Sequence, residues 1–122
     1  MQFMSIIRGP EVDTIPAGLF EAMGPFMEEA TQAGVLVSTG GLAPSKDGVR
    51  IRINNRKLSR TDGPFSETKE VVGGYAILEC ETKEEAIGWT ERFLQLHIDH
   101  FPGWEGECEL RAMMTEDQLK IE

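Results

Sequence analysis

Cysteine is scarce in this chain of 122 residues, and the two that occur, Cys80 and Cys108, stand far apart. Neither belongs to a CxxC pair or has a histidine at a ligand spacing, which excludes a structural zinc site. Each lies in an alternating, strand-like run, so we interpret both as buried free thiols, with a Cys80 to Cys108 disulfide as the alternative. Nucleotide-binding glycine loops and redox pairs are also absent, so the sequence predicts no metal and no cofactor.

Long apolar runs and basic residues are equally scarce. No segment approaches the roughly eighteen apolar residues of a membrane span, and the start MQFMSIIRGPE lacks the apolar core of a signal peptide. We therefore expect a reduced, cytoplasmic protein without a membrane partner. The 12 Lys and Arg against 21 Asp and Glu give a net charge of -9 and a pI near 4.7. The electric field of such a negative chain repels the phosphates of nucleic acid, so nucleic acid is excluded as an expected partner.

Length and periodicity predict one domain over residues 1–122, with two helices and several strands. Short or alternating apolar runs indicate strands, whereas apolar residues three and four apart indicate helices. Helices are expected from Pro16 to Ala33, with a kink or split at Gly24 and Pro25, and from Lys83 to about His97. Strands are expected at 2–9, 35–44, 49–55, 71–81 and 107–114.

The order of these elements is that of a ferredoxin-like split βαβ fold, an α+β class with its helices on one face of the sheet. Alternation in the strand at 71–81 sets Tyr75 and Ile77 on one face and Ala76 and Leu78 on the other, so both faces are apolar. An apolar sheet face that no helix covers is expected to pack against another apolar surface. We therefore expect a homodimer in which two sheets enclose a cavity.

The segment TDGPFSETKEVVGGY, residues 61–75, concentrates the polar chemistry of the chain. We expect it to turn the chain between two strands of a long hairpin, because Asp62 can bond the following backbone, Gly63 permits positive φ and the next residue is proline. In the functional alternative, Asp62 acts as a general base over the free sheet face and the Gly63 amide binds an anionic group. Glu67 and Lys69 are interpreted as a solvated surface pair.

The same segment resembles the signature of the DGPF branch of the YCII-related family, in which D-G-P-F-x-E-x-K-E leads to G-G-Y and an aliphatic strand. The matching residues are Asp62, Gly63, Pro64, Phe65, Glu67, Lys69, Glu70, Gly73, Gly74, Tyr75 and Trp89. The ending FPGWEGECELRAMM resembles that of the longer members. The resemblance implies a dimeric α/β barrel of ferredoxin-like protomers, similar to muconolactone isomerase.

The resemblance also implies a pocket, and we expect it to bind a small acidic, phenolic or lactone-like ligand at the TDGPF motif. Some members are proposed to use a histidine and an aspartate as acid and base, but the first predicted helix here contains no histidine. The catalytic candidate is therefore Asp62 alone, and the candidate ligand-binding residues are Gly63, Phe65, Tyr75 and Arg111. Members of this branch also occur beside extracytoplasmic-function sigma factors, which implies a sensing role.

Two function classes stay open at this point. The first is a noncatalytic binding or regulatory dimer, and the second is a cofactor-independent lyase or isomerase with Asp62 as general acid and base. One carboxylate contributes only about a hundred- to ten-thousand-fold to a rate, so we favour binding and leave enzymatic activity undecided.

The histidines lie together in LHIDH, where Asp99 stands between His97 and His100. We interpret them as helix-end residues that meet the helix dipole, in preference to metal ligands. Trp89 and Trp104 are interpreted as anchors of the core and of a loop.

Overall fold

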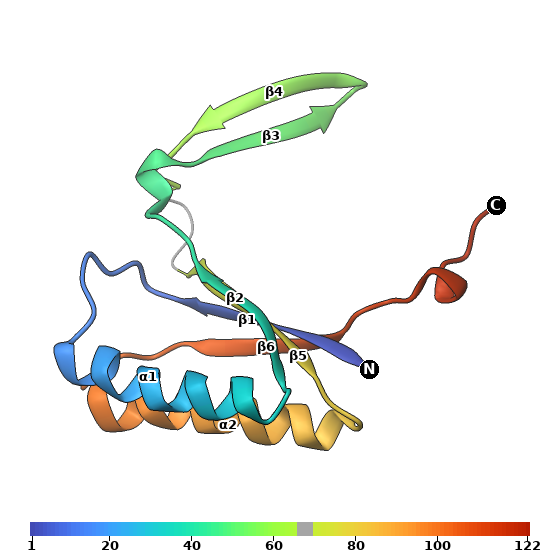
Figure 1. Cartoon of the computed structure of the whole chain (residues 1–122). Coiled ribbons are helices and arrows are strands. Elements are labelled where there is room, and N and C mark those ends of the chain that lie inside the picture. Colours follow the sequence, from blue (N-terminus) through green and yellow to red (C-terminus); the bar gives the residue numbers. More distant parts are fainter. Residues whose placement is uncertain (66–69) are drawn as a thin grey trace.

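The computed structural model describes residues 1–65 and 70–122 (Figure 1). Its elements are β1 (Gln2–Gly9), α1 (Ala17–Gln32), β2 (Leu36–Gly41), β3 (Val49–Asn54), β4 (Lys57–Asp62), β5 (Val71–Glu79), α2 (Lys83–His100) and β6 (Glu107–Ala112). Two short 3-10 turns are η1 (Ser45–Asp47) and η2 (Glu116–Gln118). Every predicted helix and strand is present, and β4 is an addition. Glu67 and Lys69, expected as a surface pair, lie outside the described residues.

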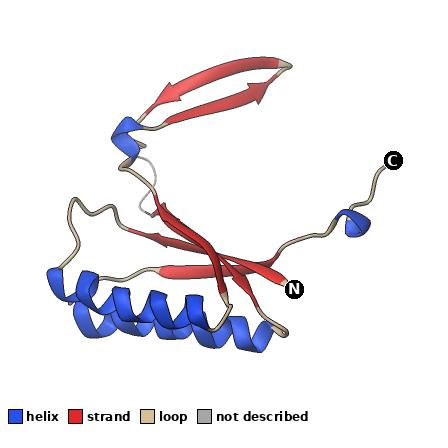
Figure 2. Ribbon diagram, viewed as in Figure 1, coloured by secondary structure: helices blue, strands red, loops and turns tan. Residues whose placement is uncertain are grey.

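Four strands form one antiparallel sheet in the order β2, β5, β1, β6. β1 pairs with β5 on one side and with β6 on the other, so the first and last strands of the chain are neighbours. Figure 2 shows α1 and α2 side by side on one face of this sheet. The arrangement confirms the α+β class and is compatible with a ferredoxin-like fold.

The core lies between the sheet and the helices because one set of alternating strand residues is apolar. Phe3 of β1, Leu78 and Cys80 pack with Ala86 of α2 in one buried cluster. Since successive strand residues point to opposite faces, the burial of Leu78 places Ile77 on the face away from the helices, and Tyr75 lies there too.

Local sequence sets the helix ends. α1 begins directly after Pro16, as predicted, because a proline at the start of a helix loses no hydrogen bond. It runs unbroken through Pro25, so the helix is not split there. At the start of α2, the side chain of Thr82 accepts a hydrogen bond from the Glu85 amide at 3.2 Å, which satisfies a free donor of the first turn.

β3 and β4 form a separate two-stranded hairpin, which stands clear of the main sheet and of both helices (Figure 1). The prediction that residues 49–55 pair with residues 71–81 is wrong, because β3 pairs with β4 and β5 pairs with β1 and β2. The reason is the turn at Asn55 and Arg56, whose φ angles of 52° and 64° close a tight two-residue hairpin.

After β6 the chain leaves the sheet, and residues 113–122 extend away from the body with η2 near their middle (Figure 1). The last strand thus ends at Ala112, two residues earlier than predicted. Among residues 1–65 and 70–122, neither helix is both long and apolar enough to cross a membrane.

Candidate functional site

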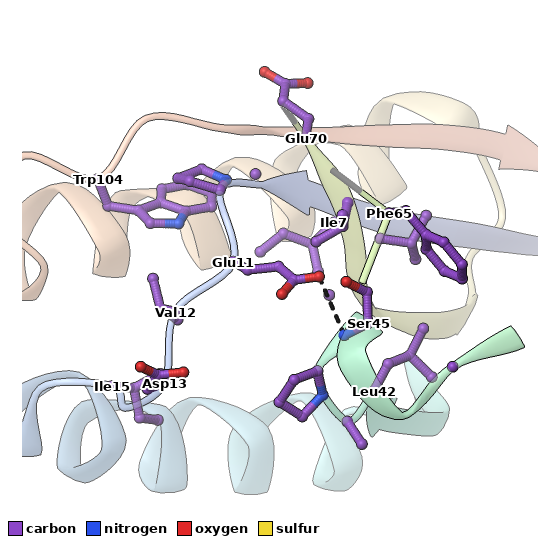
Figure 3. Close-up of a pocket in the computed structure, with 18 of the residues that line it drawn as sticks. Ile7, Glu11, Val12, Asp13, Ile15, Leu42, Ser45, Phe65, Glu70 and Trp104 are labelled. Atoms are coloured by element: carbon purple, nitrogen blue, oxygen red, sulfur yellow. Dashed lines mark hydrogen bonds between the residues drawn. The ribbon is translucent and has the colours of Figure 1, made fainter. Parts of the chain in front are cut away.

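A pocket of about 680 Å³ opens where the loop after β1, the segment between β2 and β3, and the end of α2 meet (Figure 3). Most side chains along it are apolar. The described lining comes from residues 7, 9–13, 15, 19, 42–45, 48–50, 65, 70–73, 97, 101 and 104. A cavity of this size suits a small organic ligand.

One wall of the pocket is the indole of Trp104, which sits in a slot between two glycines. A Cβ on Gly9 would lie 2.8 Å from Trp104 Cζ2, and a Cβ on Gly106 would lie 2.4 Å from Trp104 Cη2. Both distances are too short for any side chain, so glycine at these positions lets the ring approach the backbone. The indole is therefore fixed in place, with the ring of Phe101 6.3 Å away between centroids.

His97 lies beside this wall, near the end of α2. The residue is 7% exposed, and its ring centroid is 4.8 Å from that of Phe93 and 4.7 Å from that of Trp104. The Nδ1 atom lies 3.1 Å from the Phe93 carbonyl oxygen. A carbonyl can only accept, so Nδ1 carries a proton, and in the neutral ring Nε2 is the acceptor.

Nε2 of His97 has no hydrogen-bond partner among the residues that the structure describes. In the same part of the chain, no inaccessible side-chain nitrogen or oxygen lacks a partner. Nε2 is therefore not fully inaccessible, and His97 is one of the residues that line the pocket. The burial and the fixed ring make this nitrogen a preorganised acceptor for a ligand hydroxyl or amine.

The opposite wall is built by Phe65. The guanidinium of Arg50 stacks 3.9 Å above its ring centroid, and Gly48 lies beneath the ring edge, where a Cβ would stand 3.5 Å from Phe65 Cε2. A cation over an aromatic face is attracted by the ring quadrupole. Figure 3 shows Phe65 and Trp104 on opposite sides of the pocket.

Carboxylates supply most of the charge among the described lining residues. Glu11 reaches across and its Oε1 accepts a hydrogen bond from the Ser45 amide at 3.1 Å (Figure 3). Asp13 lies on the same loop, close to the start of α1, and the Glu70 carboxylate points away from the other labelled side chains. Glu11 thus ties the loop after β1 to η1 and closes that side of the pocket.

The TDGPF motif forms the junction between the hairpin and the pocket. The Gly63 amide donates to the Gly48 carbonyl at 2.9 Å. A Cβ on Gly63 would lie 1.7 Å from the Ser45 carbonyl oxygen, so only glycine fits. The Gly63–Pro64 peptide bond is cis. The motif therefore holds β4 against η1 and delivers Phe65 to the pocket wall.

The family model of the YCII-related domain matches residues 1–94. The chain belongs to the YCII-related family. The matched part includes the loop after β1, the hairpin and Phe65, whereas His97 and Trp104 of this YCII-related protein lie beyond it. None of the curated proteins compared with the chain matches it.

The structure does not bring the predicted site residues of this YCII-related protein together. Phe65 lines the pocket, but Asp62 is exposed at the end of β4 and Gly63 uses its amide within the junction. The Tyr75 hydroxyl lies 3.4 Å from Ser38 Oγ, away from the described pocket lining. Arg111 is exposed, with Nη1 3.8 Å from a Glu109 carboxylate oxygen. Their roles in binding or catalysis stay predictions.

Sequence reasoning missed His97, Trp104 and Glu11 as pocket residues. A signal for the first was present, because Trp89, Phe93, His97 and Phe101 recur every four residues and such a spacing predicts one face of a helix. The glycine that follows two residues after Trp104 indicates a close approach. Nothing in the local sequence of Glu11 predicts its contact with η1.

An ion pair lies on the free face of the sheet of this YCII-related protein, outside the pocket. Arg8 of β1 donates to Glu109 of β6, and this hydrogen bond holds the pKa of the Glu109 carboxyl below its usual value. The same contact raises the pKa of Arg8. Both side chains are about one-third exposed, so the pair stabilises the fold only modestly.

Both cysteines are free thiols; Cys80 is buried, as predicted, whereas Cys108 is only half-buried. Burial raises the pKa of Cys80 and, against a weaker opposing hydrogen bond with Ser5, that of Cys108. Raised thiol pKa values keep the reactive thiolate scarce at neutral pH. In residues 1–65 and 70–122, histidine, cysteine and acidic side chains form no group of three that could hold a metal ion.

Proposed function

We propose that this protein is a noncatalytic, small-molecule binding member of the DGPF branch that works as a cytoplasmic homodimer. Its ligand is a small phenolic or lactone-like compound in the pocket between Phe65 and Trp104. A sensing role beside a sigma factor, which the resemblance implies, is compatible with binding without turnover. The observation that carries the proposal is the fixed ring of His97, with Nδ1 bound to the Phe93 carbonyl, in the lining of an aromatic-walled pocket of about 680 Å³.

The charge of the pocket narrows the ligand classes expected from the sequence. Glu11, Asp13 and Glu70 stand among its described lining, against Arg50 as a cation there. A carboxylate ligand would meet this negative field and lose affinity, whereas a neutral phenol or lactone would not. A phenol offers a ring for the aromatic walls and a hydroxyl that donates to Nε2 of His97.

Ligand-dependent stability tests the proposal. We expect p-cresol to raise the free energy of unfolding by about 2.7 kcal/mol when present at a hundred times its dissociation constant, and benzoate at the same concentration to raise it less. The variant His97→Gln should lose this gain, while His100→Gln, an exposed histidine on the same helix end, should keep it. Each gain is measured against the same variant without ligand, so differences in intrinsic stability cancel.

Equal stabilisation of wild type and His97→Gln by p-cresol would contradict the assignment of His97 as the ligand acceptor. Stronger stabilisation by benzoate would contradict the neutral ligand class. If p-cresol, benzoate and γ-butyrolactone all leave the unfolding free energy unchanged, the binding function is wrong for these classes.

The catalytic alternative is a cofactor-independent lyase or isomerase that uses Asp62 as general acid and base. In the single chain Asp62 is exposed and outside the described pocket lining, which gives binding the stronger support. Turnover of a lactone by wild type, lost in Asp62→Asn, would favour the alternative.

The free face of the sheet supports the homodimer. Met4 and Ile6 of β1 and Tyr75 and Ile77 of β5 are half-buried apolar side chains on the side away from the helices. Packing this face on that of a second copy would bury it and form the expected barrel. Light scattering on the eluting protein should give twice the monomer mass, and a monomer at all concentrations would refute this part.

A further inference from the structure

The hairpin of β3 and β4 carries an apolar face that the chain itself does not cover. Alternation and cross-strand pairing set Val49, Ile51 and Ile53 on the same face as Leu58. Arg60 and Asp62 lie on this face too, opposite Ile51 and Val49. The exposed fractions of Ile51, Ile53 and Leu58 are 63%, 78% and 75%. Every residue of both strands except Arg50 is exposed. We call this hairpin, residues 49–62, the arm.

An isolated two-stranded hairpin is marginally stable in water, because too little apolar surface leaves the solvent. The arm stands clear of the sheet and helices of its own chain (Figure 1). Its contacts with the body that the structure describes lie at its base, where Gly63 bonds Gly48 and Arg50 stacks on Phe65. The apolar face beyond the base therefore needs a surface from outside the chain.

The charge of the arm indicates which surface covers its apolar face. The arm holds five Arg and Lys and one Asp, a charge of +4, within a chain of net charge -9. The remaining residues therefore carry -13. The positive arm is attracted to the strongly negative body of a second copy of the same chain, whereas that body would repel the phosphates of nucleic acid or an anionic membrane.

A second copy also offers apolar surface to match. Its segment after β6 exposes Met114, Leu119 and Ile121 beside Glu116 and Asp117, and this segment lies outside the sheet face that the homodimer buries. Strands of six residues span about 20 Å, which is enough to cross onto a neighbouring protomer.

We infer that the arm of each protomer packs its apolar face onto the body of a second copy of this chain, so that two arms are exchanged across a symmetric dimer. This inference rests on the homodimer of the proposed function and adds the surface that secures it. The motif TDGPF then forms the junction between the arm and the body. Phe65 belongs to this junction and also to the pocket wall, so docking of the arm and the shape of the pocket are linked.

Sedimentation equilibrium at micromolar and submicromolar concentrations tests the inference. The test variant is the double substitution Ile51→Thr with Ile53→Thr, because threonine is β-branched and keeps the strand propensity of the arm. The matched control is Ile98→Thr, an isoleucine 72% exposed on α2. We expect the dissociation constant of the dimer to rise at least about a hundredfold in the arm variant, since each lost side chain occurs twice, and to stay unchanged in the control.

High salt should also raise the dissociation constant of the wild-type dimer, because it screens the attraction between the arm of one protomer and the body of the other. An arm variant that dimerises as tightly as wild type would overturn the inference and leave the sheet-to-sheet homodimer standing. Equal weakening by Ile98→Thr would also overturn it. Arm-dependent binding of a 20-nucleotide DNA or of phosphatidylserine vesicles by a monomer would assign the arm to those partners instead.

A monomeric wild type would overturn both the arm inference and the homodimer. The pocket is judged separately, because the stabilisation of each variant by p-cresol is read without reference to its oligomeric state. Failure of the arm and failure of ligand binding are thus distinguishable.

Discussion

Gly63 is the residue of the TDGPF motif whose role the structure defines most sharply, and Gly63→Ala is the substitution that tests it. The added Cβ would lie 1.7 Å from the Ser45 carbonyl oxygen, where ordinary contacts begin at 3.4 Å. Either η1 or the base of the arm must therefore move by more than 1 Å. Any such movement also strains or breaks the 2.9 Å hydrogen bond from the Gly63 amide to Gly48.

The expected cost follows from these two contacts. Overpacking a tight site costs about 1–3 kcal/mol, and the loss of one hydrogen bond about 0.5–1.5 kcal/mol. Because η1 is a short turn without buried residues, it can shift and relieve part of the clash. We therefore expect Gly63→Ala to lower the free energy of unfolding by about 2 kcal/mol in urea denaturation.

The matched control is Gly88→Ala on the exposed side of α2, where a Cβ would meet nothing within 4 Å. That substitution should stabilise the protein by about 0.5–1 kcal/mol, since alanine favours a helix over glycine. The reasoning is refuted if Gly63→Ala unfolds within about 0.5 kcal/mol of wild type and the amide resonances of the arm do not move.

Three further predictions concern the helix cap, the ion pair and the thiols. Thr82→Ala should lower the free energy of unfolding by about 1 kcal/mol through loss of the cap of α2, and an unchanged urea midpoint would contradict this. Arg8 lowers the pKa of Glu109, so the pair stabilises the fold above the unfolded pKa of about 4.3 and loses this effect as pH falls through the folded pKa. Arg8→Gln should therefore flatten the acid limb of stability below about pH 4, and an acid limb identical to that of wild type would speak against the pair. Cys80 and Cys108 should react with Ellman's reagent far more slowly in the native protein than in urea, because burial raises the pKa of both thiols, and fast native labelling would show exposed thiols.

The fold of the main sheet could be read from the sequence because period and turn signals agree there. The strand at 2–9 is bounded as predicted, and α2 begins at Lys83, where Thr82 caps it. The pairing of the hairpin could not be read. Its turn uses Asn55 and Arg56 at positive φ, and arginine is a poor signal for such a turn, so residues 57–62 did not stand out as a strand.

The pocket was harder to predict than the fold because its residues meet through tertiary structure. Phe65 could be chosen from its place in the motif, and the structure puts it on the wall. His97 and Trp104 come from the end of α2 and the following loop, far from the motif in sequence. Local chemistry predicted a turn at Asp62 and Gly63, but Asp62 ends β4 and Gly63 does not have the expected positive φ. The contact of Gly63 with η1 depends on residues fifteen or more positions away.

The charge of the chain is distributed unevenly between the arm and the rest of the molecule. Taken over the whole chain, a net charge of -9 argues only against phosphate-bearing partners. Resolved onto the structure, the charge separates into a positive arm and a negative body. Such a separation favours association of like chains without a change in overall charge.

The most direct test of ligand binding uses the two tryptophans as internal reporters in a ¹H–¹⁵N correlation spectrum. Trp104 lines the pocket, whereas Trp89 packs against the core between α1 and α2, with its ring 5.9 Å from that of Phe26. Titration with p-cresol should shift the indole resonance of Trp104 in a saturable manner and leave that of Trp89 unchanged. If neither indole moves, or if both move together without saturation, the pocket does not bind this class of ligand and the proposed function is wrong.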